Sequence, residues 1–146
     1  MNRKLLNKLS ITFIALALML MSNISKATTY TVMASGNWSN TAIWPGAVMP
    51  PFSMGADTVI VPAGDTLTMD VSVSTGVASI IDVQGVLNSL SGIALTNNGN
   101  ITGNGVMNID HIFMNMGGLF TFTGNANANM LTMTDTLTTS ANIMVA

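Results

Sequence analysis

The chain contains no cysteine, so it can form neither a disulfide framework nor a lipid-modified cysteine anchor. Basic residues do not occur after Lys26, and glutamate is absent throughout. Beyond residue 27 the formal side-chain charges are six aspartates against no Lys or Arg, which gives −6 with His111 neutral. A surface without cations cannot neutralise phosphates, so nucleic acid and anionic lipid are excluded as expected partners.

The polar helix formers that surface helices need are almost absent, because Glu, Lys and Arg are missing after position 26 and Gln occurs once. Short runs rich in β-branched residues recur instead, separated by Gly and Asn, as in residues 57–61, 66–73 and 79–83. The chain after residue 27 is therefore predicted to be all-β and to form one domain.

Residues 1–27 have the three parts of a secretory signal peptide. A basic segment precedes an apolar run at residues 11–21, and Ser25 and Ala27 place small side chains at the −3 and −1 positions. An uncleaved membrane anchor is the alternative, but the run falls short of the roughly 20 residues that a span needs. We expect residues 1–27 to be removed, with no membrane insertion of the rest and a secreted or cell-surface location.

An internal repeat decides the predicted fold. Residues 81–88 (IDVQGVLN) align with residues 101–108 (ITGNGVMN) at an offset of 20, and residues 122–129 follow at a shift of 21. Further shifts predict an apolar column at Ile60, Ile81, Ile101, Phe122 and Ile143. The period suits one coil of a right-handed parallel β-helix, stacked at about 4.8 Å per coil. A leucine-rich repeat needs a Leu/Asn signature and a β-sandwich shows no such register, so residues 57–146 are predicted to form β-helix coils.

The same register predicts two structural columns. The first is an amide ladder at a turn, formed by Asn88, Asn108 and Asn129. The second is a column in which the chain bends or approaches its neighbour closely, formed by Gly64, Gly85 and Gly105. A ligand groove is the alternative interpretation of the Asn column.

The segment before the coils has a distinct pattern. A Trp-Ser turn, a second Trp and a Pro precede a Gly-x-Asp-x-Val stretch, a Pro-Ala-Gly turn and a strand that ends in Asp. The matching residues are Trp38, Ser39, Trp44, Pro50, Gly55, Asp57, Val59, Pro62, Ala63, Gly64 and Asp70. Over residues 30–90 the chain resembles the eight-glycine extracellular domain family and the amino-terminal modules of large surface proteins from Bacteroidetes-type bacteria. The resemblance implies an exported β-helix module, and the family includes hyaluronan-processing proteins.

Trp38 and Trp44 are open to two interpretations. The first coil of a solenoid exposes apolar side chains and strand edges, so residues 28–56 are predicted to form a cap with both rings over the open end. Exposed tryptophans that stack on sugar rings are the alternative. No comparable cap precedes Ala146, so we expect an amino-terminal part of a longer protein or a truncated reading frame. If the chain stops at Ala146, we expect self-association through the open last coil.

Little catalytic or metal-binding chemistry is indicated. Without Lys, Arg, Glu or Cys after residue 27, most of the usual acid, base and nucleophile groups are missing, although Asp remains. Asp110-His111, like the aspartates at 57, 65 and 70, lacks a ligand motif, so we expect no metal and no cofactor. Met114 and Met116 near His111 are only a weak indication of a copper-binding site.

The expected function is that of a noncatalytic surface module, adhesin-like or glycan-contacting, with an extracellular glycan or cell-surface protein as partner. The alternative is the amino-terminal domain of a polysaccharide-processing enzyme whose catalytic residues follow Ala146. Ice binding is a minor alternative suggested by Thr-x-Thr pairs, but Thr66 and Thr68 do not repeat as Thr in the predicted register.

The signal peptide gives the first prediction. The exported protein should begin at Thr28, because cleavage follows the small residue at −1. Amino-terminal sequencing of secreted material checks this, and a start upstream of residue 11 would show that the apolar run is retained.

Overall fold

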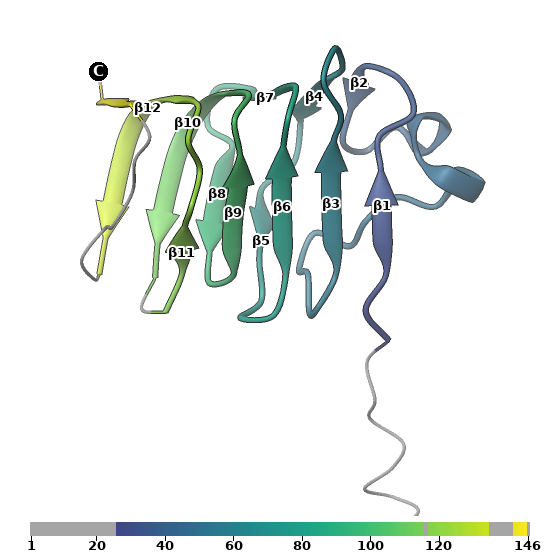
Figure 1. The fold of residues 1–146 in the computed structure, drawn as a ribbon, viewed down its shortest axis with the longest axis horizontal. Coiled ribbons are helices and arrows are strands. Elements are labelled where there is room, and N and C mark those ends of the chain that lie inside the picture. The colour runs from purple at the N-terminus through teal and green to yellow at the C-terminus, as the bar shows by residue number, and fades with distance from the viewer. Residues whose placement is uncertain (1–25, 116, 135–141, 146) are drawn as a thin grey trace, which may run out of the picture.

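The computed structural model describes residues 26–115, 117–134 and 142–145. The predicted signal peptide lies outside the described residues apart from Lys26 and Ala27. In the described part, the strands wind into a β-solenoid of about four turns, so the predicted fold class is confirmed. Near strands point up, far strands point down and successive coils advance to the left, which is a right-handed winding (Figure 1). No helix in the described ranges is long and apolar enough to cross a membrane.

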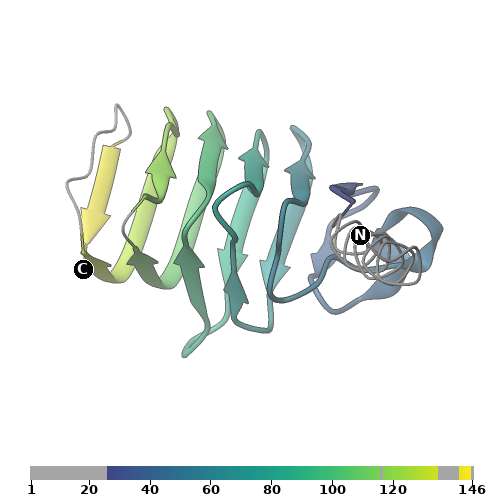
Figure 2. The same ribbon diagram turned by 90° about the horizontal axis from the view of Figure 1, so that it is seen from below.

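Each coil has three faces. The first face contains β1 (Thr29–Thr31), β3 (Thr58–Val61), β6 (Ile80–Val83), β9 (Asn100–Gly103) and β11 (Leu119–Phe120). The second contains β2 (Gly36–Asn37), β4 (Thr66–Met69), β7 (Val86–Ser89), the first parts of β10 (Val106–Met114) and β12 (Asn125–Met133), and β13 (Asn142–Val145). The third contains β5 (Val73–Ser74), β8 (Ala94–Asn97) and the second parts of β10 and β12. Figure 2 shows the coils as successive rungs.

All strand pairs in the described residues are parallel, and their register corrects the predicted column. Ile81 pairs with Ile101, as predicted. The column through Ile60, Phe122 and Ile143 is wrong, because Ile60 pairs with Asp82 and Ile143 pairs with Ala126 on the second face. The inward column of the first face is Tyr30, Val59, Ile81, Ile101 and Phe120.

The fixed period fails because the corners differ in length. Residues 62–65 join β3 to β4, but only residues 84–85 join β6 to β7. Thr58 therefore pairs with Ile80, whereas Thr66 pairs with Val86, so the offset between these two coils is larger on the first face than on the second. Between the next two coils, Leu95 pairs with Ile112 on the third face at an offset of only 17. A search at one fixed offset therefore loses the register wherever a corner changes length.

The core lies inside the coils because strand side chains alternate between inward and outward positions. Leu67, Leu87 and Met107 stack in one inward column of the second face and are fully buried. Burial of each such side chain stabilises the fold by about 1.5–3 kcal/mol. Continuous inward columns therefore hold neighbouring coils together.

Trp38 and Trp44 cover the amino-terminal end of this core. Both are fully buried, and their ring centroids lie 5.7 Å apart at an interplanar angle of 63°. The indole N–H of Trp44 donates to the carbonyl oxygen of Trp38 at 2.9 Å, and that of Trp38 donates to Pro50 at 3.3 Å. The 3-10 turns η1 (Thr41–Ile43) and η2 (Pro45–Ala47) lie at the same end (Figure 1). The alternative of a glycan platform at these rings is wrong, because neither ring is exposed.

The glycine column is also shifted from its prediction. A Cβ on Gly85 would overlap the carbonyl oxygens of Pro62 and Asp65, and a Cβ on Gly105 would overlap that of Gly85. Gly124 continues this close stacking, because a Cβ there would lie only 2.0 Å from the carbonyl oxygen of Gly105. Gly64 does not belong to the column, because Thr66 pairs with Val86 and Asp65 therefore lies beside Gly85; the Cβ position of Gly64 is open and its φ is +92°. Gly85 and Gly105 are therefore required by space, and Gly64 by backbone conformation.

These two reasons predict different costs. Gly105→Ala should lower the free energy of unfolding by about 2–4 kcal/mol, because rigid backbone must move. Gly64→Ala should cost only about 1 kcal/mol, the strain of a left-handed residue in open space. Urea unfolding of both variants measures the difference, and equal losses would contradict the close-approach interpretation of the column.

Candidate functional site

An amide ladder runs along the outer surface of the second face. The amide nitrogen of Asn108 donates to the side-chain oxygen of Asn88 at 2.9 Å, and that of Asn127 donates to Asn108 at 2.7 Å. The pairing of Asn88 with Asn108 agrees with the prediction, but Asn129 as the third member is wrong. Asn127 takes its place because β12 follows β10 at an offset of 19, one less than the offset of 20 between Asn88 and Asn108. The ladder also lies on strands rather than at a buried turn, and Asn108 is exposed.

Asn97 has the role that was predicted for the ladder. It is fully buried where β8 ends. Its side-chain oxygen accepts from the Thr75 hydroxyl at 2.8 Å, and its amide nitrogen donates to the carbonyl oxygen of Leu119 at 3.0 Å. Asn97 therefore joins three coils at this corner, and its buried polar atoms are paired, as burial requires.

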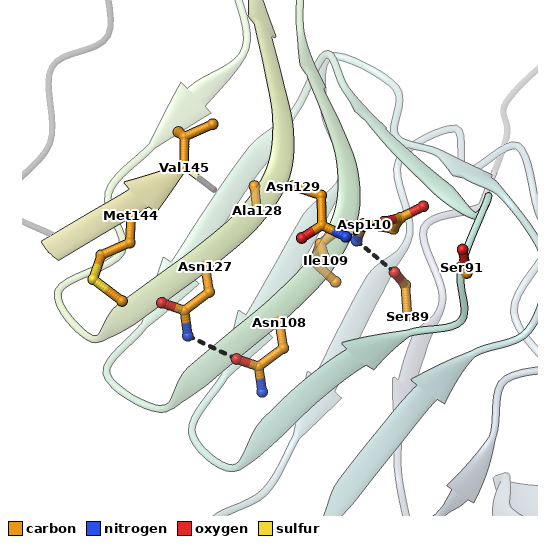
Figure 3. Close-up of a pocket in the computed structure, with 10 residues that line it drawn as sticks. All are labelled: Ser89, Ser91, Asn108, Ile109, Asp110, Asn127, Ala128, Asn129, Met144 and Val145. Carbon is orange, nitrogen blue, oxygen red and sulfur yellow. Dashed lines mark hydrogen bonds between the residues drawn. The ribbon is translucent and has the colours of Figure 1, made fainter.

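A groove of about 480 Å³ lies beside the ladder (Figure 3). We call it the ladder groove. Asn108, Asn127 and Asn129 present side-chain amides there, Asp110 presents a carboxylate, and Ser89 and Ser91 present hydroxyl groups. Its lining is completed by Ile109, Ala128, Met144 and Val145. Met144 and Val145, both more than half exposed, add apolar surface at the β13 side.

Unequal corners create this groove. Residues 90–93 bulge outward between β7 and β8, whereas β10 turns the same corner at Asp110 alone. The bulge carries Ser91, and it is fixed where the Gly92 N–H donates to the Asp110 carboxylate at 2.5 Å. The backbone N–H of Asp110 donates to the Ser89 hydroxyl at 2.7 Å. The bulge at residues 90–93 thus forms one wall of the groove, and Asp110 of the next coil holds it in place.

Asp110 is the only carboxylate among the described residues that line the ladder groove. The Gly92 N–H and the Asn129 amide both donate to it, and His111 lies 3.7 Å away. The bond from Gly92 lowers its pKa most, and the bond from Asn129 lowers it further. The group is therefore ionised near neutral pH and serves as a hydrogen-bond acceptor there.

Asp57 and Asp70, which were considered as metal ligands, have local structural partners. Asp57 accepts from the backbone N–H of Thr28 at 3.0 Å. Partial burial raises the pKa of Asp70, but bonds from the hydroxyl and backbone N–H of Ser39 outweigh it and lower the pKa. Asp70 thereby ties the segment that carries Trp38 to the first coil. Within the described ranges, no three His, Asp or Glu side chains form a group that could hold a metal ion.

The observed register also removes the basis for an ice-binding surface on the second face. Thr66 and Thr68 pair with Val86 and Asn88, so the Thr-x-Thr motif is not repeated in the next coil. A second shallow groove, of about 370 Å³, lies over the first face between Asp82, Thr102 and Thr123. It has fewer amides than the ladder groove, and no residue of the bulge lines it.

Sequence reasoning missed Asn127, Ser89 and Ser91 as site residues. The alternation Asn-Ala-Asn-Ala-Asn at residues 125–129 carried the signal for Asn127, because period-two alternation places every second side chain outward. Ser91 had no such signal, since its position depends on how far the corner bulges.

No family model, curated protein or solved structure matches this chain. The resemblance to the eight-glycine family therefore stays a prediction that rests on the residues quoted for it.

The hydrogen bonds of Asp110 predict a measurable pKa change. Asn129→Ala should raise the pKa of Asp110 towards its ordinary value of 3.8, while the Gly92 bond keeps it below that value. Because the folded-state pKa is depressed, the stability due to this group is present above the unfolded-state value and is lost as pH falls through the folded-state value. Carboxyl NMR titration checks this, with Asn100→Ala on the first face as the control. An unchanged Asp110 pKa in Asn129→Ala would contradict the assignment.

Proposed function

We propose that the chain is a noncatalytic, exported surface module that contacts glycans through the ladder groove. The observation that carries this proposal is a groove in which three side-chain amides, two hydroxyls and one carboxylate lie beside the exposed side chains of Met144 and Val145. Sugars present hydroxyl groups that donate and accept, together with apolar C–H faces, so this mixture of lining groups is complementary to them.

The strands make the groove a rigid template. Asn108 and Asn127 each use one amide N–H in the ladder, which fixes the side-chain orientation and leaves the second N–H of each amide for a ligand. Groups held in place before binding lose less conformational entropy when a ligand arrives. Repetition along the axis, at about 4.8 Å per coil, suits an extended chain with several contacts better than a single small ligand.

The same groups support binding rather than hydrolysis. A glycoside hydrolase uses a pair of carboxyl groups, one of them protonated as the general acid. The ladder groove contributes a single carboxylate among its described lining residues, and the lowered pKa of Asp110 leaves it without a proton near pH 7. Export is supported by the basic and apolar segments at the start of the sequence.

Removal of two groove amides should weaken glycan binding. The double variant Asn127→Ala, Asn129→Ala is expected to lower affinity about 30-fold, because each of the two lost hydrogen bonds is worth about 1 kcal/mol. Asn100→Ala on the first face is the matched control and should bind like the parent protein. A glycan array followed by calorimetry measures affinity, and reducing-sugar release measures turnover.

Two results would contradict the proposal. If no glycan class is bound, or if Asn100→Ala weakens binding as much as the double variant, the ladder groove is not the site. Sugar release by this chain would show that it is an enzyme.

A further inference from the structure

The charge around the ladder groove is one-sided. Asp110 contributes a carboxylate, and residues 28–146 contain no Lys or Arg that could offset it. His111 lies 3.7 Å from the carboxylate, but it is not among the residues that line the groove, and its ring contacts Phe113. An acidic sugar in the groove would therefore meet a like charge without a Lys or Arg to pair with.

Asp110 is placed to accept a hydrogen bond from a ligand in the groove. Its side chain is 11% exposed, so it lies low between the bulge and β12. Gly92 donates to one carboxylate oxygen and Asn129 to the other, which leaves further lone pairs on both oxygens. A hydroxyl group of a sugar can donate to one of these positions, and a charged acceptor strengthens such a bond about twofold over a neutral one.

We propose that the ladder groove selects uncharged glycans against acidic ones, and that Asp110 is the residue that sets this preference. The inference rests on the proposed function and adds the chemical class of the ligand. Uncharged chains donate hydroxyl groups to Asp110 and receive N–H groups from Asn108 and Asn127. Uronate and sulfate groups bring a negative charge beside Asp110. They lose hydration on binding and find no Lys or Arg side chain to pair with.

Matched polymers test the preference. The probes are dextran, galactomannan, xyloglucan and mixed-linkage β-glucan, the carboxymethyl derivative of each, and hyaluronan as a natural acidic chain. Affinity electrophoresis at about 0.01 M salt leaves charges unscreened over about 30 Å, and a repeat at about 1 M salt shortens this range to about 3 Å. Carboxymethylation of a bound polymer should weaken binding about tenfold at low salt, and the loss should shrink at high salt.

Variants assign the preference to this position. Asp110→Asn should reduce the penalty for carboxymethylation at least about threefold, whereas Asp65→Asn, with the same charge change at another corner, should not.

Asp110 also holds Gly92, so Asp110→Asn can lose the bulge. A second variant, Ser91→Lys, therefore adds a cation on the exposed bulge and should increase binding of the carboxymethyl polymer. Val77→Lys, at a different corner position that is 84% exposed, is its control.

Loss of selectivity and loss of glycan binding are distinguishable outcomes. Equal affinity for a polymer and its carboxymethyl derivative, or preferred binding of hyaluronan, overturns the selectivity and leaves glycan binding intact. Equal effects of Ser91→Lys and Val77→Lys show that net charge, not the groove, sets the preference, and they overturn the role of Asp110. Failure to bind any polymer overturns the proposed function itself.

Discussion

The close parallel stacking of one coil on the next is the constraint on which this structure depends. Backbone hydrogen bonds between coils hold the strands at a fixed spacing, and the corners must come equally near. At Gly85, Gly105 and Gly124 a carbonyl oxygen of the neighbouring coil lies so near that a Cβ would overlap it. Side chains that repeat in register are consequently brought into contact, whether they are Leu in the core or Asn outside it. Core, ladder and groove are all results of this spacing.

Polar side chains follow two different rules within that stack. Inside the corner, Asn97 is fully buried and uses its amide to satisfy backbone and hydroxyl groups of neighbouring coils. Outside, Asn108 and Asn127 bond one another and keep donors towards solvent. The same residue type thus joins coils internally in one place and forms a surface template in another, and burial decides which.

The sequence predicted the class of fold because strand alternation and the near match of residues 81–88 with 101–108 are local signals. It also predicted the contact of Asn88 with Asn108, since the two coils joined there have corners of equal length. It failed where corner length changed, so Asn129 was chosen in place of Asn127 and Gly64 was added to a column that it does not join. A ligand groove at the Asn column was only an alternative interpretation, and the wall of the ladder groove was missed because it depends on a bulge, whose extent is set by contacts such as Asp110 with Gly92 rather than by composition.

The bulge at residues 90–93 shows that this architecture can vary its exterior without disturbing its interior. Four residues stand at a corner where the next coil has one, yet Leu95 still pairs with Ile112 and the inward columns continue without a break. Length added at a corner is therefore accommodated outside the stack. Insertions and deletions at corners can diversify the contour of each coil separately, so recognition surfaces in such a solenoid are free to evolve while its shared core stays unchanged.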